Sequence, residues 1–181
     1  HKGMMPELLQ RTTEIKVIEA EDRTTVRPNC AYVIPPNKDI SILHGVLHLL
    51  EPKKTRGLRL PVDFFFRSLA LDQMDQSIGV ILSGMGSDGC LGLSAIKEQA
   101  GLVLVQDPET AKFDGMPRSA IDAGLADVVA PAEELPNKIL ACLHRRPLAS
   151  QQKVTIADSE INALDKTIIL LRAQTGHDFS L

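Results

Sequence analysis

Apolar and polar positions alternate in blocks along the second half of the chain. A continuous apolar run at residues 78–82 is typical of a strand buried on both faces, LVLVQD at residues 102–107 predicts a second buried strand, and residues 127–131 add a third, shorter strand. An amphipathic stretch follows each run, at residues 89–101, 116–127 and 132–146. Strands and helices that alternate at this spacing predict right-handed βαβ units and a mostly parallel sheet of the doubly wound α/β class.

Glycine and proline mark the ends of the predicted helices. Gly101 is the expected C-cap of the first helix, and Gly124 is expected at the end of the second. A further helix is predicted at residues 61–74, with Pro61 in its first turn. The side chains expected to face inward from that helix are Phe65, Leu69 and, as a further candidate, Phe66.

The first fifty residues predict shorter elements. A helix is expected within the first ten residues, followed by strands at residues 15–20 and 30–36. Residues 39–52 form two apolar stretches on either side of Gly45, which predicts a β-hairpin that turns at His44 and Gly45. Because these elements are short and close together, we expect them to form a small antiparallel patch.

The end of the chain changes character. Residues 145–155 are polar and without periodicity, which indicates a linker after an α/β domain at residues 1–144. Residues 156–181 predict a separate amphipathic helix that Asp158 or Ser159 caps. This C-terminal helix is expected to belong to a second unit.

Composition excludes several classes of partner. Hydrophobic residues make up 44% of the 181 residues and charged residues 24%, the profile of a soluble globular protein. A net charge of −3 argues against nucleic acid or anionic lipid as the main partner. No apolar run approaches the ~20 residues that span a bilayer, so we expect no membrane insertion.

The cysteines and the first residues bear on location. The three cysteines are odd in number and far apart, as is typical of a reducing compartment, and the first ten residues lack the apolar core of a signal peptide. We therefore expect a cytoplasmic protein. Because the sequence starts at His1 rather than methionine, we also expect it to be a piece of a longer protein.

The candidate chemistry lies in the loop that reads LSGMGSDGCLG, at residues 82–92. Its four glycines surround one carboxylate, Asp88, and ligands gather at such strand-end loops in open parallel sheets. Three interpretations remain open on residue chemistry alone. Gly84, Gly86 and Gly89 match a dinucleotide fingerprint, with Asp107 near the expected acidic position, although Asp88 would repel a pyrophosphate.

The other two interpretations concern Asp88 itself. The carboxylate can cap the helix that follows it, or it can accept the Nδ1–H of a histidine that acts as general base for a nucleophile. Other candidate groups favour structural roles. His44 and His48 lie across a turn and have no metal-binding cluster beside them, Cys90 is better explained as a packed small residue, and His144 is at a basic helix end. Ser83 and Ser87 lack a visible base.

Several motifs occur in the order of a known family. The stretches GVILSGMGSDGCLGLSAI, LVLVQDPET and DGMPRSAIDAG resemble the chemotaxis protein-glutamate methylesterase family, the CheB type. Upstream, VIEAEDRTTVRPNCAYVIPP and RLPVDFFFRSLA are similar to further stretches of that family. The resemblance extends from Met4 to about Leu143.

The resemblance implies an activity and a set of site residues. It implies hydrolysis of glutamate γ-methyl esters on chemoreceptor-type signalling proteins, and deamidation of glutamine, with no metal or organic cofactor. Asp88 would be the third member of a Ser-His-Asp triad. The residues implied to lie beside the active site are Gly84, Met85, Gly86, Gly89, Met116, Pro117 and Arg118; Arg118 either contacts an anionic substrate group or braces the loop.

The chain departs from the family at three places. The family's G-x-S-x-G-G serine and Q-H-x-x-P histidine have no counterpart here, and the serine of its R-P-S-V-D stretch is replaced by Pro61. Because family members run serine, histidine, aspartate, we expect both missing residues upstream of His1, together with the first strands of the sheet. The chain alone is then expected to be inactive and to associate through an open sheet edge.

The tail carries a weaker resemblance. INALDKTIILLRAQTGHDFSL, at residues 161–181, is similar to the opening helix of the chemotaxis receptor methyltransferase family, the CheR type. The two resemblances together imply a fusion of esterase and methyltransferase, in which S-adenosylmethionine would belong beyond this chain. An unrelated helical linker is the alternative for the tail, and a non-catalytic docking or regulatory module is the alternative for the whole.

Overall fold

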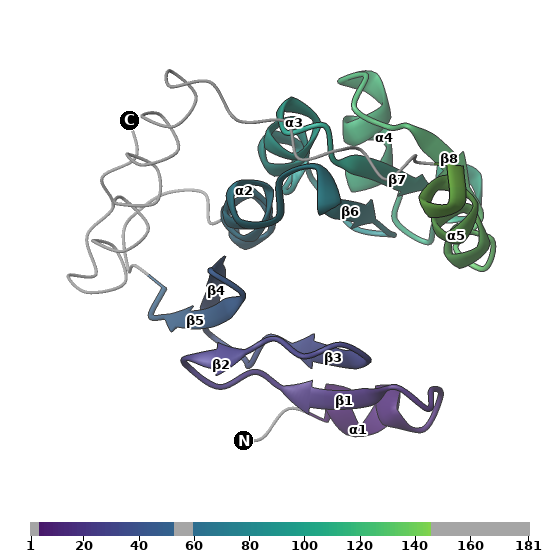
Figure 1. The fold of residues 1–181 in the computed structure, drawn as a ribbon. Coiled ribbons are helices and arrows are strands. Elements are labelled where there is room, and N and C mark those ends of the chain that lie inside the picture. Colours follow the sequence, from purple (N-terminus) through teal and green to yellow (C-terminus); the bar gives the residue numbers. More distant parts are fainter. Residues whose placement is uncertain (1–3, 53–59, 146–181) are drawn as a thin grey trace, which may run out of the picture.

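The described structure is a computed structural model that covers residues 4–52 and 60–145 (Figure 1). The predicted linker lies outside it apart from Arg145, which is the last residue of helix α5 (Leu135–Arg145) rather than a linker residue. The predicted C-terminal helix at residues 156–181 lies wholly outside the described residues. None of the described helices is long and apolar enough to cross a membrane.

A parallel sheet forms the centre of the second half, as predicted. Strands β6 (Ile78–Ile81), β7 (Leu102–Gln106) and β8 (Val128–Ala130) lie in the order β6-β7-β8, and both pairings are parallel. All five residues of β7 are buried. In β6 Gly79 and Ile81 are buried, and Ile78 and Val80 are half-buried against the core on the opposite face, so this strand also carries packed side chains on both faces.

Helices cover both faces of this sheet, which confirms the doubly wound class (Figure 1). Helices α2 (Pro61–Gln73), α3 (Cys90–Glu98) and α4 (Gly115–Asp122) pack on one face, and α5 packs on the other. Short 3-10 helices lie at Met74–Gln76 and Pro108–Thr110. The first face buries Phe66, Ala70, Ile81, Leu93, Ile96, Val103, Val105 and Ala120.

The N-terminal elements differ in part from the prediction. Helix α1 (Met5–Gln10) precedes β1 (Lys16–Glu19), and β1 pairs in parallel with β3 (Cys30–Val33), so these two strands do not belong to the antiparallel patch. The segment that connects β1 to β3 contains the short strand β2 (Thr24–Thr25), which pairs with a strand of another sheet. A parallel pairing needs this longer connection, whereas the short, closely spaced strands alone suggested antiparallel pairing.

The predicted hairpin is confirmed and forms an antiparallel sheet of order β2-β5-β4. Strands β4 (Asp39–Leu43) and β5 (Val46–Leu50) are joined by His44 and Gly45, with φ values of 50° and 70°. Both residues of a tight type I′ turn need positive φ. The Asp72 carboxylate of α2 accepts the backbone N–H groups of both turn residues, which ties the hairpin to α2.

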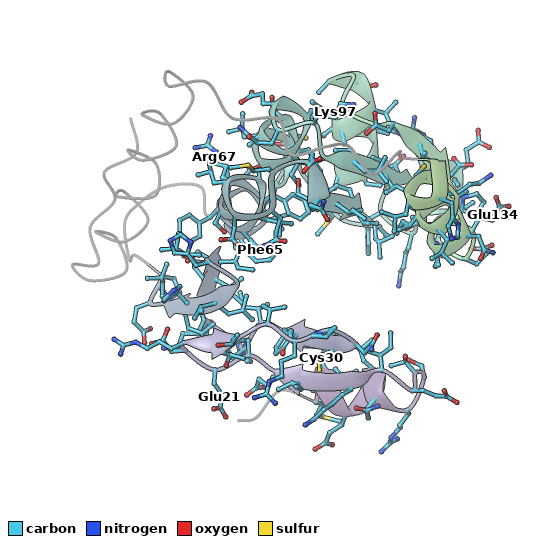
Figure 2. The ribbon with its side chains drawn as sticks, in the orientation of Figure 1. Glu21, Cys30, Phe65, Arg67, Lys97 and Glu134 are labelled. Atoms are coloured by element: carbon cyan, nitrogen blue, oxygen red, sulfur yellow. The ribbon has the colours of Figure 1, made fainter. Side chains whose placement is uncertain are left out.

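Helix α2 connects the hairpin with the parallel sheet. Phe66 is buried against α3 and the sheet, and Phe65 and Leu69 are half-buried between α2 and the hairpin, so all three predicted side chains face inward. Figure 2 shows Phe65 and Arg67 on different sides of this helix.

One predicted helix end was wrong in detail. Helix α3 does stop before Gly101, but the left-handed residue is Ala100, with a φ of 57°. The N–H of Gly101 donates to the carbonyl of Ile96 at 2.8 Å, and a Cβ at Gly101 would lie 2.5 Å from Ile96 Cγ2. Gly101 is therefore a requirement of close packing rather than of its own φ.

Candidate active site

The glycine-rich loop lies at the carboxyl end of β6, as predicted for a ligand-binding edge of the sheet. Gly86 and Gly89 adopt φ values of +83° and +101°, a region that favours glycine. Between them the chain presents Ser87 and the half-buried Asp88. Met85 is 76% exposed, so the loop offers an apolar side chain to solvent immediately beside the carboxylate segment.

Asp88 caps a helix, but not the helix that follows it. Its Oδ2 accepts the N–H of Val62 at 3.2 Å and its Oδ1 accepts the N–H of Asp63 at 3.0 Å, both in the first turn of α2. The local cap interpretation was therefore wrong about the helix. The N-cap residue of α2 is Leu60, whose side chain cannot accept a hydrogen bond. Asp88 provides the missing acceptor for the first turn of α2 from another segment of the chain.

Asp63 does the same for α3. Its Oδ1 accepts the N–H of Gly92 at 2.7 Å, while Gly89 at the N-cap of α3 has no side chain to offer. Asp63 is only 5% exposed, and burial raises the pKa of its carboxyl, with the charge of Asp88 as a smaller cause in the same direction. The hydrogen bond from Gly92 and the charge of Arg67 act against this shift.

The segment that contains Met116 anchors the glycine loop from the other side. The N–H of Gly84 donates to the carbonyl of Phe113 at 2.9 Å, and the N–H of Met116 donates to the carbonyl of Gly84 at 2.9 Å. A Cβ at Gly115 would lie 2.9 Å from the backbone N of Gly86, so only glycine allows this approach. The structure thus brings Gly84, Gly86 and Met116 together.

Pro117 and Arg118 follow on α4 and behave differently. Pro117 is buried in the first turn of α4. Arg118 Nε donates to Asp114 Oδ2 at 2.6 Å within the same helix, and this bond lowers the pKa of Asp114 and raises the pKa of Arg118. The described contact of Arg118 is therefore with its own helix, not with the loop.

Sequence reasoning missed the role of Gln106. This last residue of β7 is 7% exposed, and its Oε1 accepts the N–H of Ser83 at 2.9 Å while its Nε2 donates to Thr110. Ser83 Oγ in turn accepts the N–H of Phe113 at 2.9 Å. The sequence did offer a signal for this role: a polar residue at the end of an apolar strand is expected to be buried, and a buried amide needs hydrogen-bond partners.

The competing chemistries find little support in this geometry. Burial raises the pKa of the Cys90 thiol, and the charges of Asp63 and Asp88 raise it further, which opposes a thiolate nucleophile. Asp107 Oδ1 accepts the N–H of Glu109 at 3.0 Å and caps a 3-10 helix. The Gly92 N–H, in the turn where a dinucleotide would place its pyrophosphate, is already taken by Asp63.

Relatives of this chain are numerous. A protein of Rhodobacter capsulatus described as an uncharacterized 104.1 kDa protein in the hypE 3′ region is 40% identical over 147 residues, 81% of this chain and 15% of the relative. The protein-glutamate methylesterase/protein-glutamine glutaminase of Moorella thermoacetica is 39% identical over 144 residues, 77% of this chain and 34% of the relative. The chain thus spans about a third or less of these relatives.

A solved structure and a family model agree with these matches. The crystal structure of the CheB methylesterase catalytic domain of Thermotoga maritima matches with a TM-score of 0.68 at 35% identity, over 78% of this chain and 79% of that one. The family model described as CheB methylesterase matches residues 1–139, most of the chain. With this fold and this loop, the chain belongs to the CheB methylesterase family.

Proposed function

We propose that the protein containing this chain is a cytoplasmic protein-glutamate methylesterase and glutamine deamidase that acts on chemoreceptor-type signalling proteins. One observation carries the proposal. In a member of the CheB methylesterase family, the Asp88 carboxylate lies on the loop at the carboxyl end of a parallel strand, where two backbone N–H groups of α2 hold it in one orientation. A carboxylate in a fixed orientation is what a triad histidine needs as its partner.

The mechanism assigns Asp88 a supporting step. The serine and the histidine have no counterpart motif in these 181 residues and are supplied by the preceding part of the protein, in the order that family members follow. The histidine takes the proton of the serine Oγ, which attacks the γ-ester carbonyl, and methanol leaves with that proton. Asp88 accepts the histidine Nδ1–H and stabilises the imidazolium that forms.

Water then hydrolyses the acyl-enzyme to glutamate and regenerates the serine. With glutamine as the substrate the same steps release ammonia in place of methanol, because attack occurs on the same side-chain carbonyl. Gly84, Met85, Gly86 and Gly89 border the reacting groups, and Met116 and Pro117 support the loop from α4. No metal or organic cofactor takes part in this scheme.

The test is Asp88→Asn in the full-length protein. Asparagine keeps the shape but presents the wrong hydrogen-bonding pattern to the histidine, and a change of this kind lowers kcat by about 10⁴-fold in a serine protease. Methanol release from a methylated receptor fragment measures the loss, and the thermal unfolding midpoint checks the fold. Asp122→Asn, on the exposed face of α4, is the matched control and should keep full activity. Unchanged turnover in Asp88→Asn would assign Asp88 to helix capping alone.

The 181-residue chain by itself should release no methanol, because Asp88 can neither attack a carbonyl nor transfer a proton. Removing the nucleophile or the base of a serine triad costs about 10⁶-fold in kcat. Addition of the upstream segment, covalently or as a peptide, should restore hydrolysis. Release by the chain alone would mean that Ser83 or Cys90 acts as a nucleophile.

We also propose that the chain alone self-associates through the free edge of β6. Among the described residues β6 pairs only with β7, and an unpaired strand edge invites another strand. Sedimentation of the chain with and without the upstream segment tests this. A monomer under both conditions would contradict it.

We also propose, from residues 156–181, that the parent protein has a second activity: transfer of methyl groups from S-adenosylmethionine to receptor glutamates. The motif Thr175-Gly176-His177-Asp178-Phe179 carries this proposal. The matched 147 residues make up only 15% of the 104.1 kDa relative, so a protein of that kind has room for further domains. Labelled methyl transfer to an unmethylated receptor by the full-length protein tests it, and a full-length protein that ends near residue 181 would contradict it.

A further inference from the structure

Two helix N-termini lie side by side and exchange their capping carboxylates. Asp88 precedes α3 in the chain but accepts N–H groups from α2, and Asp63 belongs to α2 but accepts an N–H from α3. The contact between the helices is close, because a Cβ at Gly92 would lie 2.5 Å from Phe66 Cβ and 3.0 Å from the Asp63 carbonyl oxygen. Each carboxylate therefore lies at the positive end of a helix dipole.

The exchange determines how firmly Asp88 is held. Gly86 and Gly89, which flank it in the loop, have no side chains that could restrain it. Its two oxygens each accept one backbone N–H of α2, which fixes the plane of the carboxylate. The orientation of Asp88 therefore depends on where α2 stands relative to the loop before α3.

Asp63 is the side chain that sets this relationship. Its carboxylate binds the N–H of Gly92, and its own backbone N–H binds Asp88, so a single residue joins both halves of the exchange. The charges of Asp88 and Arg67 influence the pKa of Asp63, and the charge of Asp63 in turn raises the pKa of the Cys90 thiol. Burial of a carboxylate that is only 5% exposed costs free energy unless hydrogen bonds offset the loss of water.

We propose that Asp63 is a positioning residue for the methylesterase reaction: its carboxylate locks α3 against α2 and thereby fixes the α2 N–H groups that orient Asp88. Asp63 does not touch the substrate. This proposal rests on the proposed function, in which Asp88 orients the catalytic histidine. Loss of the Asp63 side chain leaves the backbone N–H of residue 63 in place but frees the N-terminus of α2 to shift against the loop.

The experiment compares three variants of the full-length protein. Asp63→Ala removes the acceptor for Gly92, and we expect kcat to fall about 10²-fold with little change in KM, the scale expected for a misplacement of about 1 Å. Asp63→Asn keeps an oxygen for Gly92 and should recover kcat to within a few fold of the wild type. Asp72→Ala is the control, since it releases the hairpin turn from the same helix and lowers stability without contacting Asp88.

The variants separate positioning from general destabilisation. Asp72→Ala should lose thermal stability and keep kcat, and amide hydrogen exchange at residues 62 and 63 should speed up in Asp63→Ala but not in Asp72→Ala. If Asp63→Ala does not fold, Asp63→Glu displaces the carboxylate by one methylene and should also lower kcat. Normal kcat in Asp63→Ala or Asp63→Glu, with Asp88→Asn inactive, overturns the positioning role alone. An active Asp88→Asn overturns the proposed function instead.

Discussion

The backbone of Gly84 lies directly against the side chain of Met116. The N–H of Met116 donates to the Gly84 carbonyl at 2.9 Å, and a Cβ at Gly84 would lie 3.2 Å from Met116 Cγ and closer still to its sulfur. Gly84 has no positive φ, so this close approach, and not the backbone conformation, disfavours a larger residue.

Gly84→Ala should therefore disturb both the loop and α4. The added methyl group must displace Met116 or the loop, and overpacking of this kind costs about 1–3 kcal/mol. Urea unfolding should show the loss, and kcat should fall because the loop beside Asp88 moves. Met116→Ala in the same protein should return most of the lost stability. If the double variant is no more stable than the additive sum of the single changes, the two residues do not interact as described.

Gly92→Ala tests how tightly α2 and α3 pack. Alanine inside a helix is favoured over glycine by up to about 1 kcal/mol. Against this, the new Cβ would lie 2.5 Å from Phe66 Cβ, and overpacking costs about 1–3 kcal/mol. The net change should be a loss of stability in chemical denaturation. A gain in stability would show that the two helices can separate at little cost.

Ser68→Ala tests the bond that joins α2 to the hairpin. Ser68 Oγ accepts the N–H of Ile42 at 3.0 Å in a buried position, and the substitution leaves that N–H without its acceptor. A buried unsatisfied N–H costs about 1–3 kcal/mol. Ser94→Ala on α3 is the control, since Ser94 Oγ bonds only to the exposed Glu98 at 3.3 Å. Equal unfolding free energies for the two variants would contradict the assignment.

Asp63→Asn should change the pH dependence of stability. Burial and Asp88 raise the pKa of Asp63 above its usual 3.8, so the folded state binds that proton more tightly than the unfolded state. The contribution of Asp63 to stability is then fully present below the unfolded pKa and lost as pH rises through the folded pKa. The asparagine side chain of the variant does not titrate, so the Tm of the variant minus that of the wild type should increase from about pH 3 to about pH 7.

For Asp114→Asn, the difference in Tm from the wild type should change with pH in the opposite direction. The hydrogen bond from Arg118 lowers the pKa of Asp114, so its contribution is present above the unfolded pKa and lost as pH falls through the folded pKa. The Tm difference for this variant should fall as pH rises, and salt should weaken the effect because the pair is exposed. A rising Tm difference in both variants would contradict the assignment for Asp114, and a falling difference in both would contradict the assignment for Asp63.

Local patterns were sufficient for the central architecture. The apolar runs at β6 and β7 and the amphipathic stretches after them predicted the parallel sheet, because side-chain periodicity reports burial over a few residues. The turn at His44 and Gly45 was predictable because a glycine, which adopts positive φ readily, lies between two apolar stretches. The loop that presents Asp88 was located by its glycines and by the strand before it.

Contacts between distant segments were not predictable in this way. Asp88 and Asp63 are 25 residues apart, and which helix end receives which carboxylate depends on how α2 and α3 pack. The parallel pairing of β1 with β3, the left-handed Ala100 and the role of Gln106 likewise depend on neighbours that no local period specifies. The sequence therefore showed that Asp88 is presented at a strand end, and helix packing determined what holds it there, because buried polar groups take whichever partner the fold brings near.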